Sequence, residues 1–367
     1  MAESSSRTFG ILTSGGDCPG LNAAIRGVAK PAVTGYGMRV VGITNGFRGL
    51  IDGATRVLEA AAFDGLLTQG GTILGTSREK PFAQVPPEER IKDSVAGRSK
   101  PEKIMENYRK LGLDCLVILG GNGTHKTARL LSERGLNVIG LPKTIDNDIW
   151  GTDVSFGFHS AVDIATEAID RLHTTAHSHN RVMVIEVMGH KAGWLALYSG
   201  IAGGGDVVIL PEIPYDIENI AAHLQGRRDR GKPFSIVVVA EGAVSQAEAA
   251  DPDAPDRDVP AGERSIGYRV AGEIEAATDM ETRVTVLGYQ QRGGTPSPYD
   301  RVLATRFGTA AAEMLHRGEY GKMVALDGRK IVARPLGEIA GKLKLVPRDH
   351  DLIRTGRSVG ICFGDND

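Results

Sequence analysis

Short apolar runs, each ending at a glycine-rich or polar turn, recur along the chain. Runs of about four to eight apolar residues between turn signals are typical of strands buried on both faces of a parallel sheet. The pattern predicts strands at residues 9–13, 40–43, 116–119, 137–141, 181–187, 207–210, 235–240, 283–287 and 322–326. We therefore expect buried parallel strands along the chain.

Between these runs, apolar residues recur at helical spacing. The clearest case is the segment 158–173, where the spacing is carried by Ala161, Ile164, Ala165, Ala168, Ile169 and Leu172. Further helices are predicted from near residue 21 and at residues 101–111, 125–133, 195–202 and 303–317. Strands that alternate with helices predict an α/β fold of mostly parallel sheets wrapped on both faces. Ligands of such folds bind at the carboxyl ends of the strands.

The turn at residues 120–124 is the best candidate for a phosphate site. It follows a buried strand, and its glycines leave the backbone N–H groups open to a ligand. The helix that follows directs its positive N-terminal end at the same place. Glycine turns at residues 14–20 and 70–78 have a similar form, and the latter ends in Arg78, whose guanidinium suits phosphate. Any one of these turns could also be a tight connection that binds nothing.

The strand at 137–141 is followed by Thr144, Asp146 and Asp148. In an extended segment, residues two apart share a face, so both carboxylates would point into one cleft. One carboxylate can hold a metal ion while the other accepts a proton. The alternative is that both aspartates only cap a turn.

Composition narrows the class of protein. The 367 residues are typical of two domains, and a formal charge of −2 gives no electrostatic footprint for nucleic acid. The 48 glycines exceed the usual share of about 7% and fit many tight turns. Three scattered cysteines indicate reduced thiols in a cytosol. No apolar run approaches the roughly 18 residues of a membrane helix, and residues 1–7 lack the apolar stretch of a signal peptide. We expect a soluble, cytoplasmic protein.

Three further segments are given structural interpretations. His173, His177 and His179 lack a nearby cysteine or carboxylate that would complete a metal site, so we expect a polar helix end followed by a loop. Residues 83–101 and 245–262 are rich in charges, prolines or alanines and predict exposed surface segments.

Four segments together resemble the 6-phosphofructokinase family, and the resemblance runs in order from about residue 7 to residue 321. The segments are residues 13–20, 142–148, 186–189 and 291–294. Members of that family phosphorylate the 1-hydroxyl of fructose 6-phosphate with Mg²⁺ and either ATP or pyrophosphate, giving fructose 1,6-bisphosphate. The resemblance implies two α/β domains with the active site in the cleft between them, and a dimer or tetramer. The donor domain would comprise residues 1–157 and about 290–335, and the sugar-phosphate domain residues 158–289 and 336–367.

The resemblance also implies roles for individual residues. Asp146 would accept the proton of the sugar hydroxyl, Asp148 would act on the metal ion through water, and Thr144 would contact the transferring group. The other residues implied to contact the sugar phosphate are Ile145, Arg181, Met188, Gly189, His190, Glu241, Arg283, Tyr289 and Arg292. Of these, Arg181 and Arg283 would reach across a subunit interface. The residues implied on the donor side are Gly16, Arg78, Glu79, Gly121, Asn122, Gly123, Thr124 and Lys143, with Asn122 also as a metal ligand.

The chain departs from the family pattern at three positions. Asn122 replaces an aspartate that helps to hold Mg²⁺, so metal affinity is expected to weaken. His190 replaces an arginine that helps to neutralise the transferring phosphoryl group, and Lys143 or Lys191 could compensate. Tyr289 replaces a histidine beside the sugar phosphate, and its phenol can still donate a hydrogen bond.

Two positions bear on the phosphoryl donor. Gly123 leaves space for the α-phosphate of a nucleotide, as in relatives that use ATP, whereas Lys143 matches relatives that use pyrophosphate. We predict ATP as the donor, because Gly123 leaves space for a nucleotide and the cation of Lys143 does not block one. Pyrophosphate remains the alternative donor, and the reaction would then be reversible.

Other interpretations have less support. A regulatory subunit without catalysis would explain Asn122 and His190, but Asp146 and Asp148 are both retained. A lipid or NAD kinase would share only the glycine turn at residues 120–124. The resemblance to an allosteric family places Arg26 and Lys30 near positions that bind allosteric phosphates in bacterial relatives, whereas basic residues on an early helix are usually only solvated.

Overall fold

The computed structural model describes residues 7–83, 99–251 and 265–366, and divides the chain into two compact units. Unit 1 comprises Met1–Thr144, Ile149–Gly157 and Arg292–Leu343. Unit 2 comprises Ile145–Asp148, Phe158–Gln291 and Lys344–Asp367. The predicted fold class, α/β with mostly parallel sheets, is confirmed in each unit.

Unit 1 is built on a seven-stranded sheet with the order β11-β10-β5-β4-β1-β2-β3. The strands are β1 (Thr8–Thr13), β2 (Arg39–Ile43), β3 (Thr55–Val57), β4 (Cys115–Gly120), β5 (Val138–Pro142), β10 (Lys322–Asp327) and β11 (Lys330–Pro335). The five inner strands are parallel, and the two edge strands, β3 and β11, pair antiparallel. The inner strands are almost entirely apolar because both of their faces are covered.

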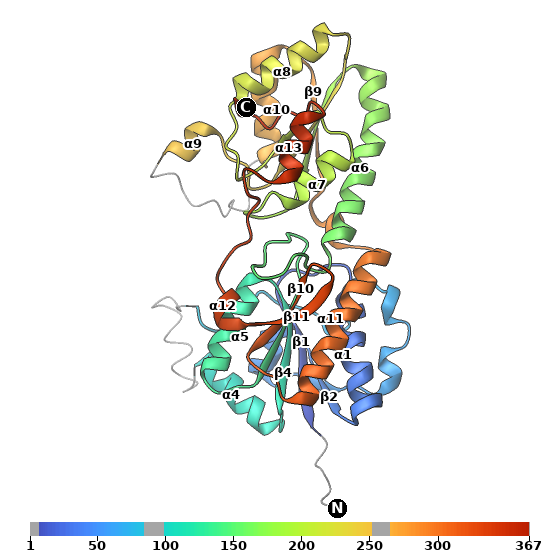
Figure 1. The fold of residues 1–367 in the computed structure, drawn as a ribbon, viewed down its shortest axis with the longest axis vertical. Coiled ribbons are helices and arrows are strands. Elements are labelled where there is room, and N and C mark those ends of the chain that lie inside the picture. Colours follow the sequence, from blue (N-terminus) through green and yellow to red (C-terminus); the bar gives the residue numbers. More distant parts are fainter. Residues whose placement is uncertain (1–6, 84–98, 252–264, 367) are drawn as a thin grey trace, which may run out of the picture. The chain divides into compact units, whose positions relative to one another are not determined.

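Helices cover both faces of this sheet (Figure 1). On one face, α1 (Leu21–Tyr36) packs against α11 (Pro298–Arg317), and the two helices cross at Gly27 and Gly308. A β-carbon on Gly308 would lie 2.5 Å from the backbone of Gly27, so the close approach requires glycine. The opposite face carries α2 (Gly46–Asp52), α4 (Lys100–Lys110), α5 (Asn122–Glu133) and α12 (Leu336–Ile339). Short 3₁₀ turns at Ala60–Phe63 and Leu66–Thr68 lie beside α1.

Unit 2 has an all-parallel sheet with the order β7-β8-β6-β9. Its strands are β6 (Val182–Val187), β7 (Val207–Ile209), β8 (Ser235–Ala240) and β9 (Thr282–Val286). Its helices are α6 (Phe158–His179), α7 (Trp194–Ala202), α8 (Ile217–Asp229), α9 (Gln246–Ala250), α10 (Ile266–Thr278) and α13 (Asp351–Ser358). Helices α8 and α10 lie beside the sheet (Figure 1). Their apolar residues pack with those of the strands in one core. A 3₁₀ turn, η3 (Gly288–Arg292), follows β9.

Three expectations from the sequence need correction. The helix expected to end near His173 continues to His179, so all three histidines lie on α6 rather than at a helix end and loop. The ring Nε2 of His173 lies 2.6 Å from the Gly203 carbonyl oxygen, and His177 packs edge-on against Phe234. These contacts hold the last turn of the helix.

The second correction concerns the C-terminal tail. Residues 336–343 belong to unit 1, because Leu336 and Ile339 are buried in its core and the Leu336 N–H donates to the Gly321 carbonyl. Third, the helix predicted at residues 125–133 begins earlier, at Asn122. Residues 246–250, which lie in a predicted surface segment, form α9 after the cap Ser245, and no residue of α9 is buried. Residues 84–98 and 252–264, which carry the rest of the two expected surface segments, lie outside the described residues.

No helix in the described parts of the chain is long and apolar enough to cross a membrane. The three cysteines form no disulfide, and burial raises the pKa of Cys18 to about 12. That thiol is a core residue without nucleophilic character.

Candidate functional site

The glycine turns identified from the sequence lie together at the carboxyl edge of the unit 1 sheet. The chain leaves β1 toward β2 on one side and later returns to β4 on the other, which makes a topological switch point between β1 and β4. Ser14 N–H donates to the Leu119 carbonyl at 2.9 Å, and Gly15 N–H donates to the Ser77 carbonyl at 2.9 Å. The Thr76 hydroxyl donates to the Gly15 carbonyl at 2.7 Å. Three turns far apart in sequence therefore form one backbone-lined surface.

The turn after β4 presents open N–H groups at the start of α5. The helix begins at Asn122, earlier than predicted, and no side chain caps its first turn. Gly120 must be glycine, because a β-carbon there would lie 2.3 Å from the Thr124 side chain. A β-carbon on Gly123, in contrast, would meet no atom within 4 Å. The first turn of α5 can therefore bind an anion through N–H groups and the helix dipole, with open space at Gly123.

His125 supports this turn from inside the unit. Its ring Nδ1 lies 2.9 Å from the Gly121 carbonyl oxygen, and its backbone N–H donates to the same oxygen at 3.0 Å. Burial lowers the pKa of His125 to about 4, so the ring is neutral and the acceptor assigns the proton to Nδ1. One buried imidazole therefore holds the carbonyl that precedes the open N–H groups. In the sequence, His125 is an ordinary residue near the start of a helix, so its contact with the Gly121 carbonyl could not be predicted.

Two cationic side chains lie against the turn after β1. The buried Lys143 ammonium donates to the Gly16 carbonyl, and Arg292 donates to the Asp17 carbonyl at 3.0 Å. A β-carbon on Gly16 would lie 2.7 Å from the Arg292 guanidinium, so glycine gives the arginine its place. The structure thus groups Arg292, expected on the sugar phosphate, with the donor-side turn of unit 1.

Among the described residues, the side chains of three other predicted donor-side residues are not hydrogen-bonded to these turns. Arg78 is exposed and makes no hydrogen bond or ion pair with another described residue. Glu79 lies 3.1 Å from Lys100, so its carboxylate is already paired. The amide oxygen of Asn122 accepts the Gly341 N–H at 3.1 Å, which leaves one lone pair for a metal ion. The donor and metal roles of these residues stay predictions.

The acidic pair lies in a segment that the structure groups with unit 2. Asp146 and Asp148 flank Asn147, whose left-handed backbone (φ 52°) turns the chain between them. Burial, and next the charge of Asp146, raise the pKa of Asp148 to about 6, while the charges of His190 and Lys344 oppose the shift. Two carboxylates in a desolvated setting are costly together, and a cation would relieve that cost.

The pair fits Mg²⁺, although no group of three or more His, Cys, Asp or Glu side chains suited to a metal ion occurs among the described residues. Mg²⁺ usually needs only one or two protein carboxylates when phosphates supply other ligands. Ile145, between Thr144 and the pair, is fully buried, so only its backbone is available to a substrate. The Thr144 carbonyl accepts the Ser155 hydroxyl at 2.9 Å, which anchors the start of the segment within unit 1.

A second group of predicted residues meets at the carboxyl edge of the unit 2 sheet. Glu241, directly after β8, accepts the N–H groups of Gly189 and His190 at 3.2 and 2.6 Å. Both residues have left-handed backbones, and burial raises the pKa of Glu241. Gln291 is fully buried and accepts the Met188 N–H at 3.3 Å. Glu241 and Gln291 therefore hold the turn after β6 from two sides.

Gln291 lies in the segment 291–294, but the sequence predicts no role for it, because burial of a single glutamine cannot be read from the sequence. Its Nε2 also donates to the Gly288 carbonyl at 3.1 Å, which ties the turn after β9 to the turn after β6. Tyr289, in the same turn, is 75% exposed and therefore available to a ligand.

The remaining predicted arginines lie at the opposite edge of the same sheet. Arg181 directly precedes β6, and Arg283, the second residue of β9, pairs in register with Met183. Both guanidinium groups bind one carboxylate, that of Glu281, at 2.7 Å in the case of Arg181. The length of β6, about 20 Å, separates them from Met188. Arg181 and Arg283 therefore cannot reach the ligand that Glu241 and Met188 would hold in the same chain.

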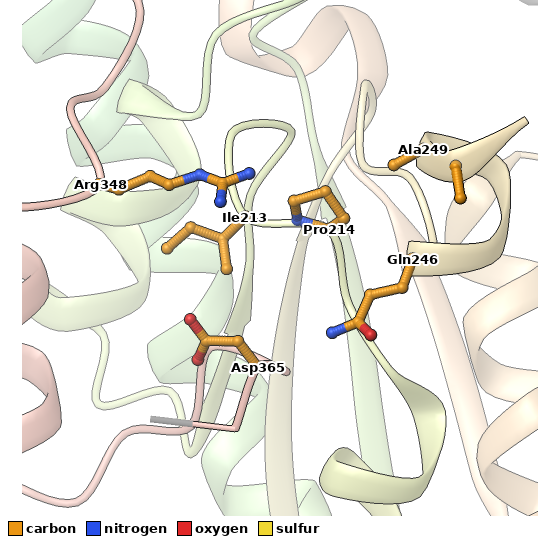
Figure 2. A pocket seen from close by; sticks show the side chains of 7 residues that line it. Ile213, Pro214, Gln246, Ala249, Arg348 and Asp365 are labelled. Carbon is orange, nitrogen blue, oxygen red and sulfur yellow. The ribbon is translucent and has the colours of Figure 1, made fainter. Parts of the chain in front are cut away.

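Unit 2 also contains a pocket of about 340 Å³ that includes none of the predicted residues (Figure 2). It is lined by Ile213, Pro214, Gln246, Ala249, Ala250, Arg348 and Asp365. Arg348 donates to the Glu212 carbonyl at 2.8 Å, and Asp365 pairs with Arg357 at 2.6 Å. The two charged side chains of this pocket are therefore already engaged, and the lining includes no acid–base pair suited to phosphoryl transfer.

Comparisons with known proteins agree on one family. A family model described as phosphofructokinase matches residues 8–315. A Spirochaeta thermophila protein named ATP-dependent 6-phosphofructokinase is 70% identical over 367 residues and covers 100% of both chains. A Bacteroides thetaiotaomicron protein named ATP-dependent 6-phosphofructokinase 3 is 56% identical over 356 residues, covering 97% of this chain and 99% of its own.

Solved structures are similar as well. A phosphofructokinase structure from Saccharomyces cerevisiae has a TM-score of 0.77 at 30% identity, covering 91% of this chain and 45% of its own. A pyrophosphate-dependent phosphofructokinase structure from Marinobacter aquaeolei has a TM-score of 0.77 at 24% identity, covering 98% and 92%. At that identity, the second likeness shows the fold alone.

The buried imidazole of His125 predicts a pH dependence of stability. Its pKa of about 4 in the folded chain lies below the ordinary value of 6.5, so the unfolded chain binds a proton first as the pH falls. The stability contributed by the neutral ring is complete above about pH 6.5 and is lost toward pH 4. Between pH 7 and pH 5, wild type should lose about 2 kcal/mol more unfolding free energy than His125→Gln. Denaturant unfolding at both pH values measures this difference.

His179→Gln is the matched control, because His179 is exposed at the end of α6. It should lose as much stability as wild type between the two pH values. Equal losses in wild type and His125→Gln would show that His125 is not held neutral.

Proposed function

The chain belongs to the phosphofructokinase family, and from this premise we propose that it is an ATP-dependent 6-phosphofructokinase. It transfers the γ-phosphoryl group of ATP to the 1-hydroxyl of fructose 6-phosphate, a step of glycolysis. The observation that carries the proposal is the acidic pair, Asp146 and Asp148, held in a desolvated segment beside His190 and Lys344. A proton acceptor next to a metal-binding carboxylate is what transfer to an alcohol requires.

Asp146 orients the 1-hydroxyl and accepts its proton. The hydroxyl oxygen forms a bond to the γ-phosphorus as the bond from that phosphorus to the β-phosphate oxygen breaks, and ADP leaves with the electron pair. Phosphoryl transfer depends mainly on alignment and charge neutralisation, so the base contributes chiefly by holding its nucleophile in line. Thr144, at the start of the same segment, contacts the transferring group.

Asp148 of unit 2 would act on Mg²⁺ through water. In unit 1, the Asn122 amide oxygen keeps one lone pair for a metal ion bound to the donor's phosphates. When bound, Mg²⁺ supplies positive charge against the phosphate oxygens. Asn122 contributes no charge, so the affinity for the metal depends more on the donor's own phosphates than in relatives with aspartate.

The donor binds to the glycine turns of unit 1. The N–H groups of Gly121, Gly123 and Thr124 and the α5 dipole bind its phosphates, and Lys143 adds a cation at the Gly16 turn. The empty space around Gly123 accommodates the α-phosphate of a nucleotide. Arg78 provides a further guanidinium for the phosphates, whereas the carboxylate of Glu79, the other predicted donor-side residue, is paired with Lys100.

The sugar phosphate binds at the carboxyl edge of the unit 2 sheet. The turn 188–190, Glu241 and Tyr289 contact the sugar. The role of Arg292 on the 6-phosphate stays a prediction, because its guanidinium lies against the Gly16 turn of unit 1. Arg181 and Arg283 act on a second copy of the chain, because they lie at the other edge of the sheet and converge on one exposed carboxylate. The functional form is therefore a homo-oligomer, a dimer or a tetramer.

A second candidate is a pyrophosphate-dependent, reversible phosphofructokinase. The observation in its favour is Lys143, whose buried ammonium lies against the donor turn, where it suits a short donor. The open space at Gly123 weighs against it, because nothing there blocks a nucleotide.

The role of Asp146 predicts a specific loss of activity. Asp146→Asn should lower kcat by about 10²-fold or more, because the amide cannot accept the hydroxyl proton. Initial rates with purified protein, fructose 6-phosphate and Mg·ATP measure this. Asp163→Asn, an exposed change on α6, is the control and should behave as wild type. A loss below about tenfold in Asp146→Asn would refute the assigned role.

The donor assignment predicts turnover with Mg·ATP and none with Mg·pyrophosphate at equal fructose 6-phosphate. Gly123→Asp should raise KM for ATP by about tenfold or more, because a carboxylate would occupy the open space beside the polyphosphate. Gly123→Ala is the matched control, since its β-carbon meets no atom within 4 Å. Turnover with pyrophosphate alone would establish the second candidate.

A further inference from the structure

Residues 344–346, here called the tail segment, are bound to the acidic segment of unit 2. The Lys344 N–H donates to the Asp148 carbonyl at 2.9 Å, and the Trp194 indole donates to the Lys344 carbonyl at 2.7 Å. The Val346 N–H donates to Glu212 at 2.9 Å. Three hydrogen bonds over three residues give the tail segment a fixed path.

The Lys344 side chain contacts the residue between the two carboxylates. Its ammonium donates to the Asn147 amide oxygen at 3.1 Å and lies 5.4 Å from the centre of the Trp194 ring. A cation at that distance from an indole face is attracted to it, so the ring helps to hold the side chain. Lys344 thus donates two hydrogen bonds to the acidic segment, one from its backbone and one from its side chain.

Asn147 needs such a restraint. It is buried and left-handed, a conformation that non-glycine residues adopt only where the surroundings hold them. The direction in which Asp146 and Asp148 point depends on this residue. A rotation at Asn147 would turn one carboxylate away from the ligand while leaving the other in place.

Lys344 also places a positive charge near the Asp148 carboxylate. Its positive charge opposes the rise in the pKa of Asp148, together with that of His190. The tail segment therefore places a cation beside the acidic segment, in addition to its hydrogen bonds.

We propose that Lys344 is a positioning residue of the phosphoryl-transfer site, which holds Asn147 so that Asp146 and Asp148 face the same ligand. The inference rests on the proposed function, since it takes Asp146 and Asp148 as the reacting pair. It extends the site to a tail segment that carries none of the sequence motifs.

Three variants of the full-length protein test this role. Lys344→Met keeps the apolar stem and removes the ammonium, and Lys344→Arg restores a donor and a charge. Lys342→Met changes an exposed lysine two residues away and is the control. In Lys344→Met, kcat should fall by about tenfold or more, with both KM values within about threefold of wild type. Lys344→Arg should recover most of the loss, and Lys342→Met should match wild type.

Hydrogen exchange of the same proteins, without substrate, provides a second readout. The amides of residues 144–148 should exchange about tenfold or more faster in Lys344→Met, and unchanged in Lys342→Met. Wild-type kcat and unchanged exchange in Lys344→Met would overturn the proposal. So would a loss of kcat that Lys344→Arg shares in full, because the cation would then have no specific role.

The two hypotheses fail in distinguishable ways. If wild type turns over with pyrophosphate instead of ATP, the variants are compared with that donor and the role of Lys344 is still decided. If wild type turns over with neither donor, the proposed function fails. The exchange measurement then decides by itself whether Lys344 restrains the acidic segment.

Discussion

The parallel strands of each sheet run in one direction, so the turns that follow them lie at one edge of the sheet. This constraint determines where most of the predicted site residues lie. In unit 1, β1 and β4 end side by side, so glycine turns distant in sequence share one edge of the sheet. In unit 2, the turns that follow β6, β8 and β9 meet at one edge, where Glu241 and Gln291 bind the turn 188–190. The same direction leaves Arg181 and Glu281 at the other edge. A sugar site that uses those arginines must therefore be shared between copies of the chain.

The second constraint is the balance of charge around the buried and half-buried carboxylates of unit 2. Burial raises the pKa of both Asp148 and Glu241, and the charge of Asp146 adds to the rise in each. His190 and Lys344 oppose the shift of Asp148, while the Glu241 carboxylate accepts two backbone N–H groups. These cations and N–H groups oppose the rise in the pKa of the two carboxylates. In unit 1, the Lys143 ammonium lies against the glycine turn that is proposed to bind the donor's phosphates.

The sequence predicted much of the fold because its strands are buried and its turns contain glycine. Strands β6 and β9 were placed within one residue, and β8 at its observed bounds, since apolar runs between turn signals leave few alternatives. The extent of α6 was missed because contacts to Gly203 and Phe234, distant in sequence, hold its last turn. The roles of Lys344 and His125 could not be predicted either, since they depend on contacts with Asn147 and Gly121 that only the fold creates.

The claim that one copy completes the site of another is tested most directly by mixing two inactive variants. Asp146→Asn lacks the base, and Arg181→Ala lacks an arginine at the opposite edge of the sheet. If the arginine acts in a second copy, co-refolded mixtures contain sites with neither defect, and activity should return to about a quarter of wild type when pairing is random. Activity no higher than the mean of the two separate variants would contradict the account, because both residues would then serve the same chain.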